Sequence, residues 1–311
     1  MVEAKVHAID IDPKTGSTIG FYTFGDDRPN VLLLSGMDGS SASCVYATYL
    51  VLKHLESLKR IDGSVTILPV ANPLAFRLGT MVSPLDSKNL DSVFPGDEHG
   101  TITQRIAWEI WRRVSKAEYV LNVQTGTQQC LSYVKAMHRE YIHVRNLASQ
   151  ISLPIVVESD GKRGSLITEA AHDGVPVATI EMRGNAREIE PQAAVEVREG
   201  ILNFLRIKDM IPGDSMEVSN TLTGRLQHVN VEDEGFFVPN CSLGDSVRPG
   251  DIIGKVEDKG EITTRYEGKV VSLSRMNYVF EGDIVARVAL PLVSQSETEK
   301  SNHTSKYRRK W

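Results

Sequence analysis

The chain has 311 residues, of which 41% are hydrophobic and 24% are charged. This composition is typical of a globular protein and excludes a disordered, collagen-like or coiled-coil chain. Lys and Arg number 35 against 40 Asp and Glu, and the net charge of −5 offers no overall basic surface to nucleic acid or anionic lipid. Three cysteines without metal-binding spacing favour a reducing compartment. Since there is no apolar signal core and no apolar stretch of about 20 residues, we expect a cytoplasmic protein that binds neither nucleic acid nor membrane.

Short apolar runs mark the strands expected in the first two thirds of the chain. In chain order they are Val31–Leu34, Val65–Val70, Tyr119–Val123, Ile155–Val157 and Val177–Ile180. Helical patterns lie between and after them, at Ala42–Leu58, Thr103–Val114 and Gln192–Ile207. Strands that alternate with helices predict an α/β fold, in which a mainly parallel mixed sheet is flanked by helices on both faces.

The pattern changes after Ile207, where the helical period ends and short β-rich runs separated by Gly, Pro, Asn and Asp begin. The boundary is marked by Ile211-Pro212-Gly213-Asp214. We therefore predict an α/β domain over residues 1–210, a small β-sandwich or barrel domain over 211–293, and a disordered polar tail over 294–311. The tail ends in basic residues, for which a binding role is an alternative.

The predicted small domain contains an internal repeat. Residues Val247–Val256 match Val279–Val288, and each copy has a Gly-Asp turn between two short runs. Two such copies are typical of a pseudo-symmetric β-sandwich of the biotinyl/lipoyl type. Carrier domains of that type expose a modifiable lysine on a hairpin, and Lys259 lies close to that place. Because the flanking residues of a modification hairpin are missing, we favour a solvated turn lysine.

Five motifs adjoin the predicted elements of the first domain. They are Leu34–Ser41, Pro69–Phe76, Phe94–Gly96, Leu121–Gly126 and Thr179–Gly184. In order and spacing the motifs resemble those of the succinylglutamate desuccinylase/aspartoacylase family, a branch of the zinc carboxypeptidase clan. The resemblance runs from about residue 28 to residue 290 and implies a zinc-carboxypeptidase-like fold.

The resemblance implies a hydrolase that cleaves the amide bond of an N-acyl amino acid at a zinc ion. Two histidines and a carboxylate hold the metal in such a site and leave a position open for water. This chain has Asp38 and Ser41 at the positions of the first histidine and the carboxylate, and Gln124 at that of the second histidine. These residues supply only oxygen donors, which suit zinc poorly compared with imidazole. We therefore expect neither zinc nor another cofactor; Mg²⁺ or Ca²⁺ held by Asp38, Gln124 and water is the alternative.

Other family positions are retained in part. Glu181 corresponds to the catalytic glutamate of the family. The two arginines that bind substrate carboxylates through paired hydrogen bonds are replaced by Met81 and Ser92. From these correspondences we expect Glu181 to be the catalytic residue of any surviving chemistry. The expected ligand-binding residues are Asp38, Ser41, Asn72, Asp91, Gln124 and Arg183.

A new nucleophile is a further alternative. Cys44 begins the first predicted helix and Cys130 lies beyond the third strand, while His138 and His143 follow downstream. A cysteine with a histidine base would fit these residue types. Nothing in the spacing requires it, since buried cysteines usually behave as small core residues.

The candidate residues occur where predicted strands end, as Asp38, Asn72, Gln124 and Glu181 illustrate. Loops at the carboxyl ends of parallel strands converge on one crevice, so we expect these side chains to line one concavity. Its carboxylates would make the concavity negative. We expect it to prefer neutral or cationic groups unless Arg77 or Arg183 enters it.

The sequence therefore favours a non-catalytic relative of the family, acting as a binding, regulatory or structural subunit for a small molecule of unknown identity. We expect a homo-oligomer, or a hetero-oligomer with an active paralogue. The competing hypothesis is an enzyme, an amidohydrolase or deacylase that acts on C–N amide bonds through Glu181 with an unusual metal or with none.

Overall fold

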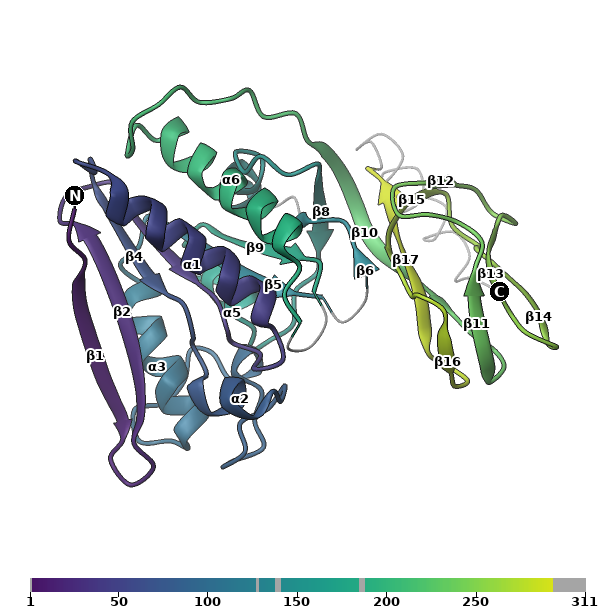
Figure 1. Ribbon diagram of the computed structural model, residues 1–311, viewed down its shortest axis with the longest axis horizontal. Coiled ribbons are helices and arrows are strands. Elements are labelled where there is room, and N and C mark those ends of the chain that lie inside the picture. The colour runs from purple at the N-terminus through teal and green to yellow at the C-terminus, as the bar shows by residue number, and fades with distance from the viewer. Residues whose placement is uncertain (1, 127–128, 138–140, 185–187, 293–311) are drawn as a thin grey trace, which may run out of the picture.

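The structure is a computed structural model that describes residues 2–126, 129–137, 141–184 and 188–292. A helix-covered sheet occupies the N-terminal side of the molecule, and a region made of strands alone extends from it (Figure 1). The predicted tail over 294–311 and His138 lie outside the described residues. No helix among the described residues is long and apolar enough to cross a membrane.

The strands and helices expected from the sequence are present with small shifts at their ends. The strands are β3 (Asn30–Leu34), β4 (Ser64–Leu68), β5 (Tyr119–Thr125), β8 (Ile155–Ser159) and β9 (Val177–Met182). The helices are α1 (Ala42–Ser57), α3 (Ile102–Val114) and α6 (Pro191–Ile207). Helix α3 begins at a capping box, in which Thr101 and Gln104 exchange side-chain and backbone hydrogen bonds. These elements confirm the predicted α/β fold.

Several elements escape prediction because they are short or half-exposed. An N-terminal hairpin is formed by β1 (Lys5–Asp12) and β2 (Ser17–Gly25). The remaining short elements are α2 (Pro73–Leu78), the 3₁₀ turn η1 (Leu90–Ser92), β6 (Gln129–Cys130), β7 (Tyr133–Met137), α4 (Ile142–Ala148) and α5 (Leu166–His172). Strand β7 matters most, because it lies between β9 and β8 in the sheet.

The main sheet has 13 strands, and its order is β1-β2-β4-β3-β5-β9-β7-β8-β10-β17-β15-β12, with β6 paired to β15. Its centre is parallel from β4 through β3 and β5 to β9. Strand β7 then runs antiparallel to β9 and parallel to β8. The sheet is therefore mixed, and the carboxyl ends of β3, β5 and β9 open on one edge.

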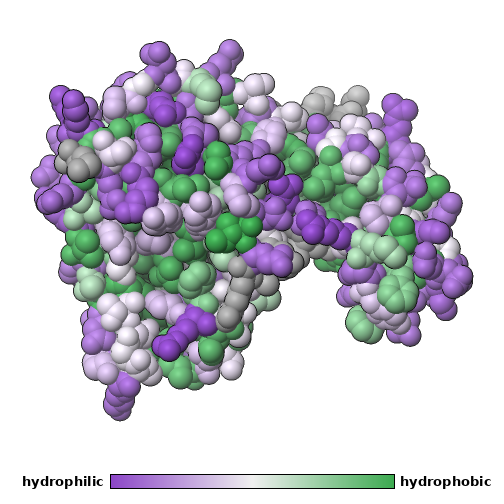
Figure 2. All heavy atoms as spheres, in the orientation of Figure 1, coloured by the Kyte–Doolittle hydropathy of each residue, from purple (hydrophilic) through white to green (hydrophobic). Residues whose placement is uncertain are grey.

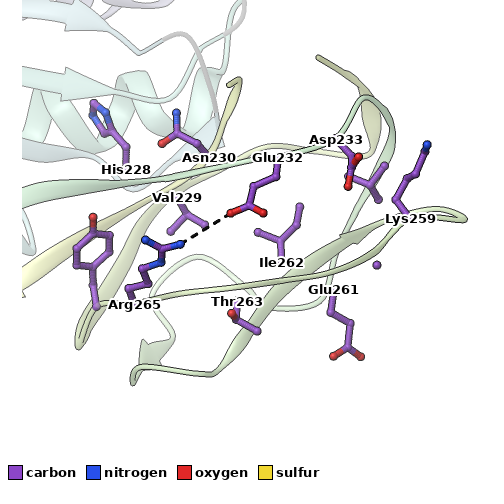
Figure 3. A pocket seen from close by; sticks show the side chains of 13 residues that line it. His228, Val229, Asn230, Glu232, Asp233, Lys259, Glu261, Ile262, Thr263 and Arg265 are labelled. Carbon is purple, nitrogen blue, oxygen red and sulfur yellow. Dashed lines mark ion pairs between the residues drawn. The ribbon is translucent and has the colours of Figure 1, made fainter. Parts of the chain in front are cut away.

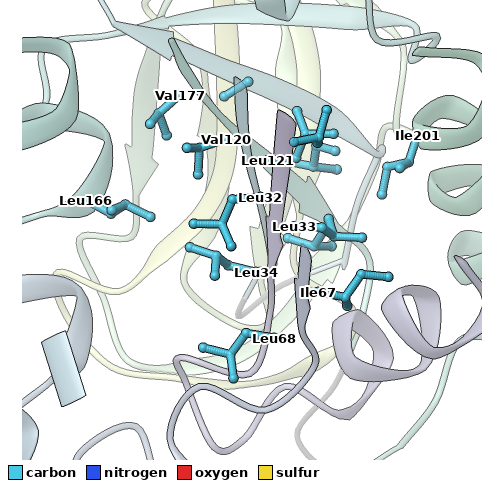
Figure 4. Close-up of a cluster of buried hydrophobic side chains, with 14 of the residues drawn as sticks. Leu32, Leu33, Leu34, Ile67, Leu68, Val120, Leu121, Leu166, Val177 and Ile201 are labelled. Atoms are coloured by element: carbon cyan, nitrogen blue, oxygen red, sulfur yellow. The ribbon is translucent and has the colours of Figure 1, made fainter. Parts of the chain in front are cut away.

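The core of the α/β region forms where the central strands meet the covering helices. Figure 4 shows Leu32, Leu33, Leu34, Ile67, Leu68, Val120, Leu121, Leu166, Val177 and Ile201 gathered there. All are at most 2% exposed. Full burial of each such side chain stabilises the fold by about 1.5–3 kcal/mol. The tightly packed strands hold the edge residues in fixed register.

The C-terminal region consists of strands, and it has a hydrophobic core of its own. The strands are β10 (Thr221–Asn230), β11 (Gly235–Pro239), β12 (Ser246–Val247), β13 (Ile252–Val256), β14 (Gly260–Thr263), β15 (Gly268–Leu273), β16 (Asn277–Val279) and β17 (Ile284–Pro291). A separate antiparallel sheet has the order β14-β13-β11-β16. Strand β10 also pairs in parallel with β8, so hydrogen bonding of the main sheet continues into this region. The division into domains at residue 210 stays a prediction.

An apolar patch lies over two strands of the C-terminal region. Green side chains gather over β11 and β16 at the lower right of Figure 2. The exposed apolar residues of this part are Phe236, Met276, Tyr278 and Phe280. Lys259 is exposed at the tip of the β13–β14 hairpin. The carrier role considered for it stays an alternative.

Candidate functional site

The site lies at the carboxyl ends of the central strands. Gln124 of β5 pairs in register with Glu181 of β9, and Glu181 pairs on its other side with Tyr133 of β7. Directly paired residues point to the same face of a sheet. Three side chains from adjacent strands therefore stand side by side, and the strand register alone builds the floor of a site.

These side chains border a hollow of about 520 Å³. Four of the expected site residues line it together, namely Asp38, Asp91, Gln124 and Glu181. The other lining residues are Met37, Met81, Asn89, Ser92, Thr125, Gly126, Tyr133, Lys135, Lys162, Leu226, His228 and Arg287. Since Leu226, His228 and Arg287 belong to β10 and β17, the C-terminal strands close one side of the hollow.

Three other expected site residues lie outside this lining. Ser41 is buried before α1, where its carbonyl oxygen accepts a hydrogen bond from the Cys44 thiol. Asn72 is fully buried and caps α2, since its Oδ1 accepts from the Ala75 backbone N–H at 3.3 Å. The Arg183 guanidinium lies 3.5 Å from the Glu190 carboxylate. In the structure Asn72 and Arg183 use their side chains, and Ser41 its backbone carbonyl, for contacts within the protein.

Asp91 is held in the floor of the site by two donors. Its Oδ2 accepts a hydrogen bond of 2.9 Å from the Gln124 amide nitrogen, and its Oδ1 accepts one of 2.8 Å from the Leu166 backbone N–H. Burial raises the pKa of Asp91, although these hydrogen bonds and the nearby Lys135 charge act in the opposite direction. The Gln124 amide nitrogen therefore donates its hydrogen bond to a carboxylate of the protein itself.

Glu181 likewise has a partner within the protein, which is a cation. The Lys135 ammonium forms a close ion pair with Glu181 Oε1, and only 28% and 12% of the two side chains are exposed. Burial lowers the pKa of Lys135, but the attraction of Glu181 and Asp91 outweighs that effect, so the pKa is raised overall. Lys135 is therefore positively charged at the centre of the site.

Sequence reasoning missed the cations of the site for identifiable reasons. Lys135 lies in the run Tyr133–Met137, which is short but alternates as a strand does. The lysine within this apolar run was the one feature of the sequence that could have indicated a cation in the site. Arg287 lies in the second repeat copy at the position that Lys255 occupies in the first. Lys255 is exposed whereas Arg287 borders the hollow, and nothing in the local sequence distinguishes them.

The charge of the hollow differs from the sequence-based expectation. The carboxylates in its lining are Asp38, Asp91 and Glu181, and the cations are Lys135, Lys162 and Arg287. Three negative and three positive groups give a formal charge of zero. The expectation of a negative concavity was therefore wrong, because cations arrive from β7, β17 and the loop after β8. Neither of the arginines considered earlier, Arg77 and Arg183, lines the hollow.

The cysteines do not suit nucleophilic chemistry. Burial raises the pKa of the Cys44 thiol to about 11 and that of Cys130 to about 12. Only the thiolate is a nucleophile, so both side chains are inert near neutral pH. His143 lies on α4 with its ring edge-on to Tyr141. These positions favour core roles for the two cysteines.

Asp38, Ser41 and Gln124, which the resemblance places at the family's metal positions, do not form a set of donors that suits zinc. Ser41 does not reach the lining of the hollow, and Gln124 donates to Asp91. Asp38 turns one oxygen toward Ser40, accepting from its backbone N–H at 2.8 Å and from its hydroxyl at 2.7 Å. Among the described residues, no group of three His, Cys, Asp or Glu side chains is arranged to hold a metal. A hard cation would likewise meet one available carboxylate, a weak anchor.

A second hollow, of about 460 Å³, lies between the end of β10 and the β13–β14 hairpin (Figure 3). Glu232 and Arg265 approach within 3.8 Å there, but their side chains are 89% and 86% exposed. An exposed pair of this kind contributes about 0–1 kcal/mol. The ion pair of Lys135 and Glu181 is much less exposed, at 28% and 12%, and makes the first hollow the stronger candidate site.

The α/β region also matches a known family. Residues 27–208 match the model of the succinylglutamate desuccinylase/aspartoacylase catalytic domain. The chain belongs to this family. The matched span covers more than half of the chain and reaches the end of α6, so it includes every strand end that builds the floor of the site. The family consists of amidohydrolase-like and deacylase-like proteins.

Individual relatives support the same family and fold. An N-alpha-acetyl-L-2,4-diaminobutyric acid deacetylase from Halomonas elongata is 26% identical over 259 residues, which cover 75% of this chain and 71% of that protein. The product-bound ectoine utilization protein EutE (DoeB) from Ruegeria pomeroyi has a TM-score of 0.80 at 21% identity, covering 93% of this chain and 96% of that one. An aspartoacylase family protein from Mesorhizobium loti has a TM-score of 0.79 at 20% identity, with 94% and 96% covered. The structural likenesses show a shared fold over nearly the whole chain.

Proposed function

We propose that this chain is a non-catalytic member of the family, which binds a small molecule in the hollow at the ends of β5 and β9 and acts as a binding or regulatory subunit. The observation that carries the proposal is the ion pair between Lys135 and Glu181 in the floor of the site. It is supported by the second internal contact, from the Gln124 amide to Asp91. Together these contacts turn the polar side chains of the floor toward one another.

The physical reasoning concerns the base and the cation. A general base needs a lone pair directed at the proton that it removes, and the Lys135 ammonium occupies an oxygen of Glu181. The same positive charge repels a divalent cation brought to this floor. Lys135 thus opposes both parts of the family's zinc chemistry.

A second candidate function rests on the sequence relative. The Halomonas protein is named as a deacetylase, and it is 26% identical over most of this chain. If that activity extends to this chain, Glu181 is the residue placed to act on an amide bond within the hollow. This candidate requires Lys135 to release Glu181 when a substrate binds.

An amide-hydrolysis assay separates the two candidates. The chain is incubated with a panel of N-acetyl amino acids, N-alpha-acetyl-L-2,4-diaminobutyrate included, in the presence of Zn²⁺, Mn²⁺ or Mg²⁺ and without added metal. We expect acetate release no greater than that of the matched variant Glu181→Gln. Turnover that is lost in Glu181→Gln would support the deacetylase and overturn the proposal.

The assembly and location of the protein stay predictions. A regulatory subunit needs a partner, and we propose a second copy of this chain or an active paralogue. A cytoplasmic location agrees with three free cysteines among the described residues. Size measurement of the purified protein, alone and from cell extract, tests the partnership.

A further inference from the structure

The apolar patch over β11 and β16 contains a row of aromatic rings (Figure 2). Phe236 of β11 pairs in register with Tyr278 of β16, and their ring centroids are 5.3 Å apart. Phe280 continues the row, with its ring 5.4 Å from that of Tyr278. These three residues are 54%, 46% and 61% exposed. Single exposed apolar residues are common on protein surfaces, but a contiguous group of them marks an interaction surface.

Acidic turns surround this patch. The turns β10–β11, β13–β14 and β16–β17 lie at one end of the strands, where the Gly282 backbone N–H donates to the Val231 carbonyl at 2.9 Å and the Glu257 N–H to the Phe236 carbonyl at 3.0 Å. The exposed carboxylates of the three turns belong to Glu232, Asp233, Glu234, Glu257, Asp258, Glu281 and Asp283. The cations beside them belong to Lys255, Lys259 and Arg265. Seven negative and three positive groups leave a formal charge of −4 around the rings.

The chain contains a segment of complementary composition, which lies outside the described residues. It reads Lys306-Tyr307-Arg308-Arg309-Lys310-Trp311, with four cations, two aromatic side chains and no acid. Alternate side chains of an extended segment point to opposite sides, so Tyr307, Arg309 and Trp311 would share one side and the other three cations the opposite side. Aromatic and guanidinium groups stack on aromatic rings, and cations pair with carboxylates. The segment therefore matches both the rings and the acidic turns.

The connection to the segment is long enough for it to reach the patch of its own chain. Strand β17 begins at Ile284, beside the acidic β16–β17 turn, and ends at Pro291, so its 8 residues span about 27 Å. The 14 peptide units between Leu292 and Lys306 reach up to about 46–50 Å when extended. The return along β17 uses little more than half of this length. A short tether also gives a segment an effective concentration of about millimolar, so that a weak contact suffices.

We propose that the segment Lys306–Trp311 docks on the apolar patch of its own chain, with its aromatic side chains on the rings of Phe236, Tyr278 and Phe280 and its cations on the acidic turns. The inference goes beyond ligand binding in the hollow and does not depend on it. Docking there also covers an open sheet edge, since β16 pairs only with β11 among the described strands. An uncovered edge with apolar side chains is prone to pair with another chain. The segment thus shields this face.

Limited trypsin digestion of the complete chain measures docking, because a docked segment must be released before the protease can cleave it. Mass spectrometry follows cleavage after Arg308 and Arg309 at low salt. A trace of synthetic peptide of residues 303–311 in the same digest is the undocked standard. We expect cleavage of the chain at least about fivefold slower than that of the peptide. The difference should shrink at about 0.5 M NaCl, where attraction between exposed charges is screened.

Variants of the patch separate the two parts of the contact. The double change Phe236→Ala/Phe280→Ala removes two rings, and Glu234→Gln/Glu281→Gln removes two charges while keeping the shape of the side chains. Each should bring the cleavage rate of the chain to within about twofold of that of the peptide.

Matched controls make the same changes elsewhere. Tyr49 is 46% exposed on α1, and Glu3 and Glu98 are exposed in the α/β region. Tyr49→Ala and Glu3→Gln/Glu98→Gln should leave the protection unchanged. Thermal unfolding of all four variants verifies that the fold is retained.

The docking proposal is wrong if the chain and the peptide are cleaved equally fast at low salt. Protection that persists in both patch variants, or that is lost equally in the controls, would also overturn it. Protection that increases with protein concentration would assign the patch to the segment of a second copy and overturn docking within one chain. None of these results involves the hollow, so amide turnover in the assay of the preceding section would leave this inference intact.

Discussion

Removing the Lys135 ammonium is the most informative single change, because it leaves two carboxylates of the floor without their cation. In Lys135→Met the side chain keeps much of its length but loses the charge that pairs with Glu181 and acts on Asp91. Breaking a buried ion pair by removing one partner costs about 3–5 kcal/mol. Since 28% of the lysine side chain is exposed, we expect the lower end, a loss of about 3 kcal/mol in the free energy of unfolding. For a region of this size, where 1 kcal/mol lowers the midpoint of thermal unfolding by about 2–4 °C, the midpoint should fall by roughly 6–12 °C.

The assay is chemical denaturation together with calorimetric melting, and its design isolates the ion pair. The double variant Lys135→Met/Glu181→Gln should recover much of the loss, because it removes the uncompensated charge as well. Lys255→Met, at an exposed position of β13, is the matched control and should change stability by less than about 0.5 kcal/mol. A loss below about 1 kcal/mol in Lys135→Met, or a double variant no more stable than the single one, would refute the reasoning.

The difference in stability between the unaltered chain and Lys135→Met should depend on pH, and the direction of the Lys135 pKa shift determines how. The pKa of Lys135 in the folded protein is raised above its ordinary value of 10.5. A raised pKa means that the folded state holds the proton more tightly than the unfolded state does, so the contribution is fully present below pH 10.5. The stability difference between the unaltered chain and Lys135→Met should therefore persist from neutral pH to that value and narrow above it. Denaturation midpoints at pH 7, 9 and above 10.5 measure this trend.

Two further predictions concern the loops and the thiols. Gly39→Ala should lower the free energy of unfolding by about 1–3 kcal/mol, because a Cβ at Gly39 would lie 2.0 Å from the Ala75 carbonyl carbon. In the matched control Gly20→Ala, the added Cβ would meet no atom closer than 3.8 Å, so the change should be tolerated. Chemical denaturation of both variants measures the difference. Iodoacetamide at pH 7.5 should modify the part-exposed Cys241 before the buried Cys44 and Cys130. Peptide mass mapping records the order of modification. Rapid modification of Cys44 would contradict the burial of this thiol and its raised pKa.

The predictable part of the fold was the part with a strong hydrophobic signal. The buried strands Val31–Leu34 and Tyr119–Val123 and the amphipathic α3 differ from the structure by only a few end residues. The parallel order of these strands also explains why Gln124 and Glu181 could be expected to meet. The N-terminal hairpin was missed because residues Lys5–Ile9 are exposed or half-exposed and give no core pattern.

The site was less predictable, because its charges come from elements that the sequence does not connect. Glu181 and Gln124 are near the ends of recognisable strands, but their partners Lys135 and Asp91 lie on a five-residue strand and a single 3₁₀ turn. Arg287 reaches the hollow only because β17 joins the main sheet through β10. Long-range strand pairing of this kind leaves no local signal.

The zinc content of the chain of 311 residues tests the central claim most directly. The protein is purified without chelator, equilibrated with zinc, freed of unbound metal by gel filtration and measured by atomic emission, with Gln124→Ala and Asp38→Ala as comparisons. The proposed function predicts far less than one equivalent of zinc, with no difference among the three proteins. One equivalent of zinc in the unaltered chain, lost in Gln124→Ala or Asp38→Ala, would contradict it.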